Sequence, residues 1–267
     1  MKKLNIMVVG AHPDDCEGGC GGTAIKYVRE GCHVTFVSVT DGSAGHQTMD
    51  RETLARVRRQ EAAESAKTAG IDSIVLSHPD GRLEADLEAR EEMVRLIRRL
   101  RPDLIFTHRL NDYHPDHRNT SQIVEDSSYL VMVPAICPDT PALDYQPAIF
   151  FIHDSFERPY PFCADIAVAI DEVLEQKIRM TSCHRSQYSD FLPWMARKQG
   201  EIDEDYEISR YPYDAIAGWD ASTAEHCRSR LLARYGKEKA IRYAEAYEMS
   251  EYGRQLSPYE LEEYFPR

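Results

Sequence analysis

Short apolar runs alternate with longer amphipathic segments along the first half of the chain. The apolar runs predict buried strands at residues 4–10, 33–42, 73–81 and 103–108. The segments between them repeat apolar residues at helical spacing and predict helices at 21–31, 51–69, 86–102 and about 117–132. Strands that alternate with helices in this way indicate an α/β domain, in which helices cover both faces of a parallel sheet.

The second half of the chain follows this pattern less closely. It predicts two more strands, at 147–156 and 164–171, and helices at 171–188 and roughly 222–248. Residues 189–220 are rich in Pro, Gly, Tyr and acidic residues, and we interpret them as an irregular lid or specificity insertion. We therefore expect a single domain over residues 1–267.

Composition narrows the class of protein. The chain has 267 residues and a net charge of −13, which disfavours nucleic acid as a partner because like charges repel. It has no apolar run long enough to predict a membrane span. The seven cysteines contain no CxxC pair and indicate free thiols. The start, "MKKLNIMVVG", indicates a first strand rather than a signal peptide, so we expect a cytoplasmic protein.

Two similar polar motifs follow predicted strands. "HPDD" spans 12–15 and "HPDH" spans 114–117. Because parallel strands end at the same edge of a sheet, both motifs are expected where such sheets bind ligands. Histidine and aspartate are zinc ligands, and a catalytic zinc site uses three protein ligands and an open position. The motifs therefore indicate a metal site. The alternative is that the aspartates cap helices and the histidines are ordinary polar residues.

Two other motifs are given structural interpretations. "SHPDG" at 77–81 also contains His-Pro-Asp, but Pro-Asp-Gly is typical of a β-turn, so His78 is left out of the metal set. "GGCGGT" at 18–23 lacks both the Walker lysine spacing and the G-x-G-x-x-G pattern of phosphate-binding loops. Its glycines are better explained by close packing of a helix on the sheet.

The two polar motifs, "AHPDDCE" (11–17) and "HPDH", resemble the paired signatures of the PIG-L/LmbE-like zinc-dependent N-deacetylases. Further similar segments are "RRQEAAESAKTAGI" (58–71), "LSHPDGRL" (76–83), "KIRMTSCHRSQY" (177–188) and "YAEAYEM" (243–249). The resemblance implies a Rossmann-like three-layer sandwich with a mostly parallel sheet and an irregular C-terminal excursion. It also implies a homo-oligomeric enzyme that removes the N-acetyl group from an N-acetylglucosamine-type small molecule or conjugate.

The resemblance also implies a role for each site residue. The zinc ligands would be His12, Asp15 and His117, although ligand type alone leaves Fe²⁺ open. Asp14 would act as the general base. His114 would stabilise the oxyanion or act as an acid, with Asp116 orienting it. These roles are chemically consistent, because a bound metal ion polarises the carbonyl and a neighbouring carboxylate transfers protons.

Three substrate contacts and the reaction itself have alternatives. Arg58 would bind sugar hydroxyls or belong to a solvated helix face. Tyr113 would donate a hydrogen bond to the intermediate or be an ordinary loop residue. His184 would line the site or cap a helix. The reaction alternatives are metal-dependent hydrolysis of another amide or ester, or sugar binding without catalysis. A two-metal phosphoesterase needs bridging carboxylates, and only one ligand aspartate is assigned here.

Overall fold

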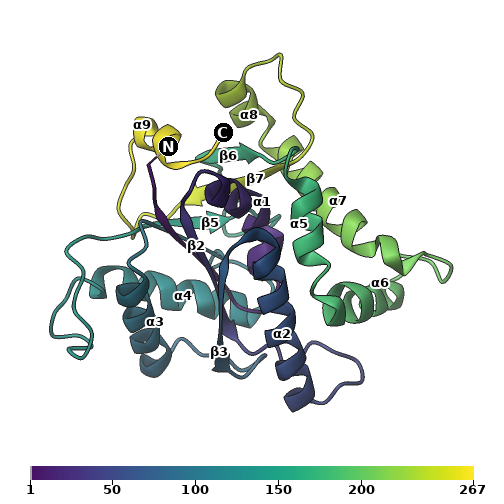
Figure 1. Cartoon of the computed structure of the whole chain (residues 1–267), viewed down its shortest axis with the longest axis horizontal. Helices are drawn as coiled ribbons and strands as arrows, with labels where there is room; N and C mark the ends of the chain where they lie inside the picture. The colour runs from purple at the N-terminus through teal and green to yellow at the C-terminus, as the bar shows by residue number, and fades with distance from the viewer. Residues whose placement is uncertain (1) are drawn as a thin grey trace.

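The computed structural model describes residues 2–267, which form one seven-stranded sheet with helices on both faces (Figure 1). The strands lie in the spatial order β3-β2-β1-β4-β5-β7-β6. Neighbouring strands are parallel except where β7 pairs with β5 and with β6. Their bounds are β1 Asn5–Gly10, β2 His33–Thr40, β3 Asp72–His78, β4 Leu104–Thr107, β5 Ala148–Ile152, β6 Ile166–Ala169 and β7 Ala244–Met249.

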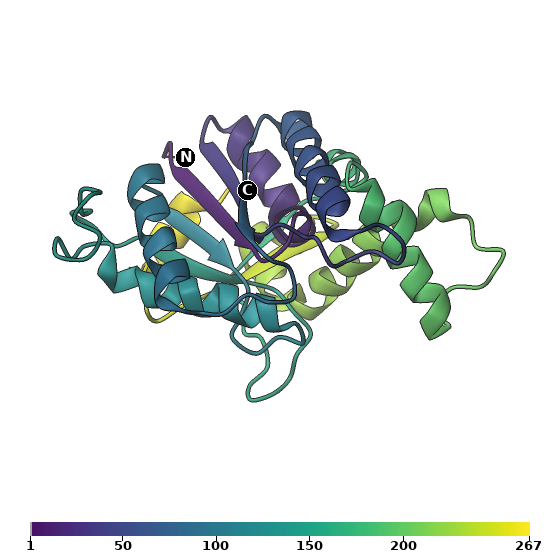
Figure 2. The same cartoon turned by 90° about the horizontal axis from the view of Figure 1, so that it is seen from below.

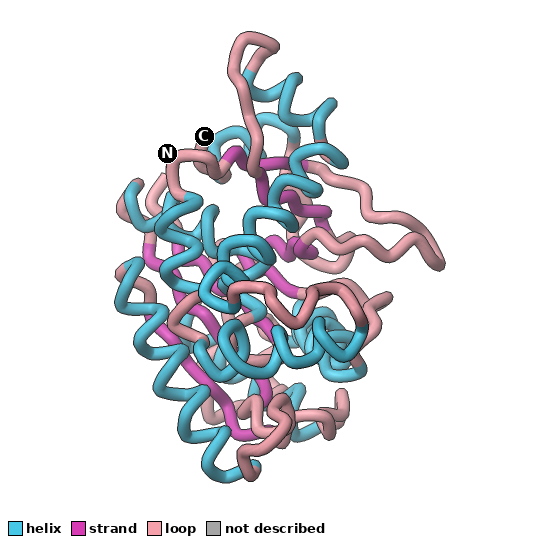
Figure 3. The backbone as a smooth tube through the Cα atoms, turned by 90° about the vertical axis from the view of Figure 1, so that its right-hand side faces the viewer, coloured by secondary structure: helices cyan, strands magenta, loops and turns pink. Residues whose placement is uncertain are grey.

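Both faces of the sheet are buried by helices. Along β1, Ile6 and Val8 pack into one apolar cluster, and Met7 and Val9 pack into another on the opposite face. The first cluster includes α1 (Asp15–Arg29), α2 (Arg51–Ala69) and α5 (Leu174–Thr181), and the second includes α3 (Leu87–Leu100) and α4 (Pro115–Leu130). Figure 3 shows the helices of the first group in front of the strands. Burial on both faces explains why the strands read as continuous apolar runs.

The first half of the chain agrees closely with prediction. The bounds of α2 are those expected, with the Asp50 side chain accepting the Thr53 N–H at its start and Gly70 in the left-handed region at its end. Helix α1 begins earlier than expected, because the glycine-rich segment is helical. A Cβ on Gly22 would lie 2.8 Å from Cγ2 of Ile170, which confirms that this segment needs glycine for close packing.

The second half of the chain differs from prediction. The helix expected at 171–188 is broken into α5 and a π-helix, Ser186–Phe191. The segment expected to be irregular contains α6 (Leu192–Gln199), a 3-10 helix (Ile208–Arg210) and much of α7 (Tyr211–His226). Figure 2 shows α6 and the loop after it projecting to one side of the sheet. The prediction of one helix over roughly 222–248 is also wrong. Helix α8 spans Arg228–Tyr235, residues 244–249 form β7, and α9 follows at Pro258–Tyr264.

The topology brings both polar motifs to one edge of the sheet. His12 and the two aspartates follow β1, and "HPDH" follows the neighbouring parallel strand β4. The "SHPDG" turn after β3 lies at the same edge, two strands from β1. No helix within residues 2–267 is long and apolar enough to cross a membrane.

Candidate metal centre and active site

The three predicted metal ligands converge. Nδ1 of His12 lies 3.4 Å from Oδ2 of Asp15 and 3.3 Å from Nε2 of His117, and the third side of this triangle is 3.5 Å. A tetrahedral ion with bonds of about 2.0–2.2 Å would hold its ligand atoms roughly 3.3–3.6 Å apart. The donor set therefore fits a zinc-sized tetrahedral ion in both chemistry and size.

Carboxylates lie beside the outer ring nitrogens of the two candidate ligand histidines. Nε2 of His12 lies 3.2 Å from Oδ1 of Asp80 and 3.4 Å from Oδ2 of Asp116. Nδ1 of His117 lies 3.1 Å from Oδ1 of Asp112. Each imidazole thus turns one nitrogen to a carboxylate and the other into the ligand triangle. This arrangement is typical of metal-binding histidines, in which the carboxylate sets the tautomer.

The electrostatics of this cluster favour a positive charge at its centre. Burial alone would lower the pKa of His12, but Asp116, Asp15 and Asp80 raise it well above its usual value. Burial would likewise raise the pKa of Asp15, but His117, His108 and His12 hold it well below its usual range. A divalent cation would provide the same compensation, and it would compete with protons for the histidine nitrogens.

Asp14 is held by Arg58 beside the ligand triangle. Oδ1 of Asp14 accepts a hydrogen bond from Nη2 of Arg58 at 2.7 Å, and the same nitrogen donates to the Pro13 carbonyl at 2.6 Å. Gly42 accommodates the guanidinium: its φ is +67°, and a Cβ there would lie 2.8 Å from Cδ of Arg58. Burial raises the pKa of Asp14, and Arg58 opposes this shift.

These contacts give Arg58 a positioning role. Its side chain is buried, with Nη1 donating to the Gly42 carbonyl at 3.3 Å. Nε is the one nitrogen of Arg58 with no hydrogen-bond partner in residues 2–267. Asp14 itself has a φ of 141°, an uncommon conformation for a residue with a side chain, and such strain is often found at functional sites. The expected contact of Arg58 with a sugar stays a prediction.

Asp116 orients His114 through its backbone and not, as expected, through its carboxylate. The Asp116 N–H donates to Nδ1 of His114 at 3.1 Å, while the carboxylate accepts from the Gly81 N–H at 2.6 Å and contacts His12. Because Nδ1 accepts a hydrogen bond, a neutral His114 carries its proton on Nε2. Burial and the nearby His12 and His117 lower the pKa of His114. A lowered pKa favours the neutral imidazole of His114 over the imidazolium.

The other two predicted substrate contacts differ in accessibility. Tyr113 is 72% exposed, and its ring meets the His114 ring edge-on with centroids 5.7 Å apart. His184 is 0% exposed, and its Nε2 lies 2.9 Å from Oε1 of Glu17, which also accepts from Ser65 at 2.7 Å. His184 thus contacts Glu17 from a fully buried position, and its expected role in lining the site stays a prediction.

Three site residues were not predicted: Asp80, Asp112 and His108. Asp80 belongs to the "SHPDG" turn, whose His78 contacts Glu92 at 2.8 Å, away from the ligands, in agreement with its exclusion. Nε2 of His108 lies 3.2 Å from Oδ2 of Asp15, and its ring stacks on His117 at 4.0 Å. His108 ends a predicted strand, so its position was a usable signal, whereas Asp112 had none.

An α/β sheet whose strand ends hold a tetrahedral donor set beside a half-buried carboxylate defines a candidate metal-dependent enzyme. Residues 7–128 match the PIG-L family, described as GlcNAc-PI de-N-acetylase. The chain is also 30% identical over 197 residues to the diacetylchitobiose deacetylase of Thermococcus kodakarensis, covering 69% of this chain and 70% of that protein. This chain belongs to the PIG-L family, as its motifs indicated.

A second relative is covered less completely. The chain is 34% identical over 147 residues to the 1D-myo-inositol 2-acetamido-2-deoxy-alpha-D-glucopyranoside deacetylase of Thermobispora bispora, covering 44% of this chain. The match spans about half of that relative, 49% of its length. Both relatives are deacetylases of acetylated amino sugars by name.

Solved structures confirm the fold. The N,N'-diacetylchitobiose deacetylase from Pyrococcus horikoshii aligns with a TM-score of 0.68 and 24% identity, over 92% of this chain and 84% of that one. The 4-carboxy-2-hydroxymuconate hydratase from Pseudomonas putida KT2440 aligns with a TM-score of 0.71 and 17% identity, over 96% and 98%. Since one fold carries both a deacetylase and a hydratase, the reaction must be argued from the site.

Proposed function

We propose that this chain removes the N-acetyl group from an N-acetylglucosamine-type small molecule or conjugate. His12, Asp15 and His117 would hold one divalent ion, zinc or iron. The observation that carries the proposal is the donor triangle of 3.3–3.5 Å beside the half-buried Asp14. The names of the two relatives support the choice of an acetylated amino sugar.

Asp14 would act as the proton carrier, because it directly precedes the candidate ligand Asp15 and only Oδ1 of its carboxylate contacts Arg58. When bound, the ion would polarise the amide carbonyl and lower the pKa of a water molecule. Because Arg58 donates to Oδ1 of Asp14, Oδ2 is left to accept a proton from the attacking water. The same carboxyl then delivers this proton to the leaving amine. Arg58 opposes the rise that burial causes in the pKa of Asp14 and orients its carboxylate.

His114 supplies a hydrogen-bond donor on the side of the cluster next to Tyr113. Its Nε2–H would donate to the oxygen of the acetyl carbonyl as negative charge develops there. The backbone N–H of Asp116 fixes this tautomer, so no proton needs to move on His114 before it can donate. Tyr113, exposed beside it, is available to contact the substrate.

The test measures acetate release by the metal-loaded protein from N-acetylglucosamine, diacetylchitobiose and an N-acetylglucosamine–inositol conjugate. Asp14→Asn should lower turnover by at least about 10³-fold while leaving one metal equivalent per chain, because it removes the proton acceptor but no ligand. Asp190→Asn, at an exposed aspartate, is the matched control. Activity retained by Asp14→Asn would disprove the role of Asp14. A metal-loaded wild-type protein that releases no acetate would disprove the function.

Two related alternatives enter the same screen. The same residues would serve another amide or an ester, so an acetyl ester and a non-sugar acetamide are included as substrates. Binding of the sugars without acetate release would identify a sugar-binding protein. We also propose a cytoplasmic homo-oligomer, in agreement with its seven free cysteines and with the family resemblance. Light scattering after size exclusion measures the oligomeric state.

A further inference from the structure

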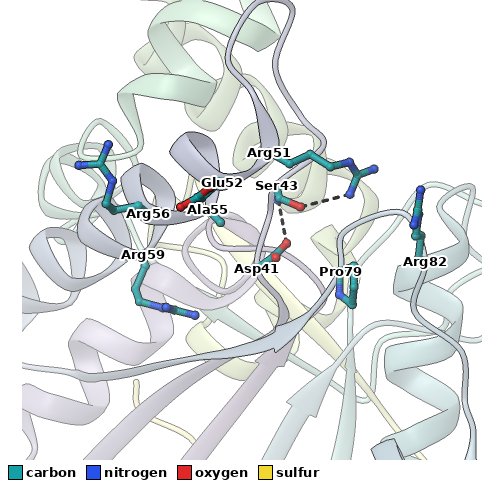
Figure 4. A pocket seen from close by; sticks show the side chains of 9 residues that line it. All are labelled: Asp41, Ser43, Arg51, Glu52, Ala55, Arg56, Arg59, Pro79 and Arg82. Atoms are coloured by element: carbon teal, nitrogen blue, oxygen red, sulfur yellow. Dashed lines mark hydrogen bonds between the residues drawn. The ribbon is translucent and has the colours of Figure 1, made fainter.

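A depression of about 650 Å³ lies between the first half of α2 and the loops that follow β2 and β3. Four of its lining residues are arginines, namely Arg51, Arg56, Arg59 and Arg82, and we call it the arginine pocket. In Figure 4, Arg56 and Arg59 lie on one side of the depression and Arg51 and Arg82 lie on the other. Three of the guanidinium groups come from α2 and the fourth, that of Arg82, comes from the loop after β3.

The arginine pocket carries positive charge that the rest of the chain does not neutralise. Within residues 2–267, none of its four arginines forms an ion pair, although the chain has 45 acidic and 32 basic residues. The pocket contains two carboxylates. Of these, Asp41 accepts the backbone N–H groups of Ser43 at 3.0 Å and Asp80 at 3.2 Å. Four cations against two anions leave a local excess of positive charge on a protein of net charge −13.

Helix α2 divides its arginines between the arginine pocket and the active site. Arg56 and Arg59 are three residues apart, so they share one face of the helix, and both are exposed. Arg58 points away from that face and is buried against Asp14. From the sequence, a solvated helix face was an alternative position for these arginines. Arg56 and Arg59 do lie on such a face, whereas Arg58 is buried.

The arginine pocket and the metal centre are joined through one residue. Nη1 of Arg51 donates to the Asp80 carbonyl at 3.1 Å and to Oγ of Ser43 at 3.3 Å, which anchors the guanidinium. The carboxylate of Asp80 lies 3.2 Å from the ligand histidine His12. Asp80 therefore contacts both Arg51 of the arginine pocket and His12 of the metal centre, so the two regions are neighbours.

We propose that the arginine pocket binds an anionic group, a phosphate or a carboxylate, on the part of the substrate that is attached to the amino sugar. This proposal rests on the proposed deacetylase function. The depression falls in the size range of small-molecule sites, about 300–1,000 Å³. Arginine is suited to the task because its planar fork donates two parallel hydrogen bonds to either oxyanion.

The test compares two substrates that differ in charge, N-acetylglucosamine 1-phosphate and the methyl glycoside of N-acetylglucosamine. We expect the wild-type protein to prefer the phosphate in kcat/KM, and added salt to weaken the preference. The double variant Arg59→Ala/Arg82→Ala should lower the ratio of the two kcat/KM values at least about tenfold, the scale of one lost charged hydrogen bond. Arg99→Ala/Arg179→Ala removes two other exposed arginines and should leave the ratio unchanged.

A second readout separates this proposal from the proposed function. Calorimetry with the Asp14→Asn protein measures binding of the two sugars without turnover. If the wild-type protein released no acetate, a binding preference for the phosphate that Arg59→Ala/Arg82→Ala abolishes would still support the arginine pocket. Equal affinity for both sugars, or a preference that survives in the double variant, would overturn it.

Inorganic phosphate distinguishes a group on the substrate from a free anion. Competition with N-acetylglucosamine 1-phosphate that is weaker in the double variant supports a subsite for the substrate's own anion. If phosphate instead accelerated turnover of the methyl glycoside through the same arginines, the occupant would be a free anion. That result would overturn the assignment to the substrate.

Discussion

Two histidine-containing regions lie at the same edge of the sheet in opposite surroundings. His12 follows β1 and is flanked by three carboxylates, which raise its pKa well above the usual value. His153 follows β5, where its ring packs against Phe162 at 4.9 Å and Trp219 at 5.4 Å. Burial lowers the pKa of His153 to about 4. The partners of a histidine, rather than its place after a strand, decide whether it serves as a charged or ligating group or as a neutral packing residue.

The largest effect on metal content and activity is expected when a candidate ligand in the region of His12 is removed. His117→Ala should lose the bound metal and, with it, detectable acetate release, because two donors remain where a tetrahedral site needs three. His153→Gln should keep both, since His153 contacts Thr223 at 3.0 Å and no metal ligand. Metal analysis and acetate assays on the two variants check this. Equal metal loss in both would show that the carboxylate surroundings do not define the site.

The next largest effect shows whether His114 binds the metal or donates a hydrogen bond to the substrate. Nitrogen atoms of His12, His114 and His117 lie within 4.8 Å of one another, so His114 is a geometric alternative to Asp15 as a ligand. If His114 is the donor, His114→Ala should lower kcat by about 10²–10³-fold and leave the metal content unchanged. Metal content and kcat are measured on the same preparation. An empty metal site in His114→Ala would assign it as a ligand.

The parallel half of the fold was predictable because local and tertiary preferences agree there. Helix α2 has a capping aspartate, helical spacing and a terminal glycine, and both polar motifs follow strands that neighbour each other in the sheet. Strand β7 was missed because its sequence, "AEAYEM", is rich in helix-forming residues. Its pairing with β5 and β6 overrides that preference, which no local signal reports.

The candidate ligands were predictable from the sequence, and their supporting residues were not. The resemblance of the two motifs to the PIG-L signatures implied His12, Asp15 and His117 as ligands, and the fold brings these three side chains together. The partner of His117, Asp112, lies in an irregular loop, and its contact depends on how that loop folds over α4. The contact of the Asp116 carboxylate with His12 likewise depends on where Gly81 and the turn after β3 come to lie.

The smallest expected effect is a change in the free energy of unfolding that comes from His153. The pKa of His153 is about 4 in the folded protein and near 6.5 ordinarily. Between these two pH values, the unfolded chain binds a proton on this histidine and the folded chain does not. The neutral His153 therefore makes its full contribution to the free energy of unfolding above pH 6.5, and this contribution is lost as the pH falls towards 4. Acidification from pH 7 to 5 should therefore cost about 2 kcal/mol through this histidine.

Urea unfolding at both pH values, with chelator present so that metal release does not contribute, measures this effect. His153→Gln lacks the titrating group, so its unfolding free energy should fall by about 2 kcal/mol less than that of the wild type between pH 7 and 5. His33→Gln, which replaces an exposed histidine, is the matched control and should behave as the wild type does. If His153→Gln and the wild type lost equal stability, His153 would not be held neutral by its surroundings. His153 and His12 would then differ in the residues that surround them and not in their protonation.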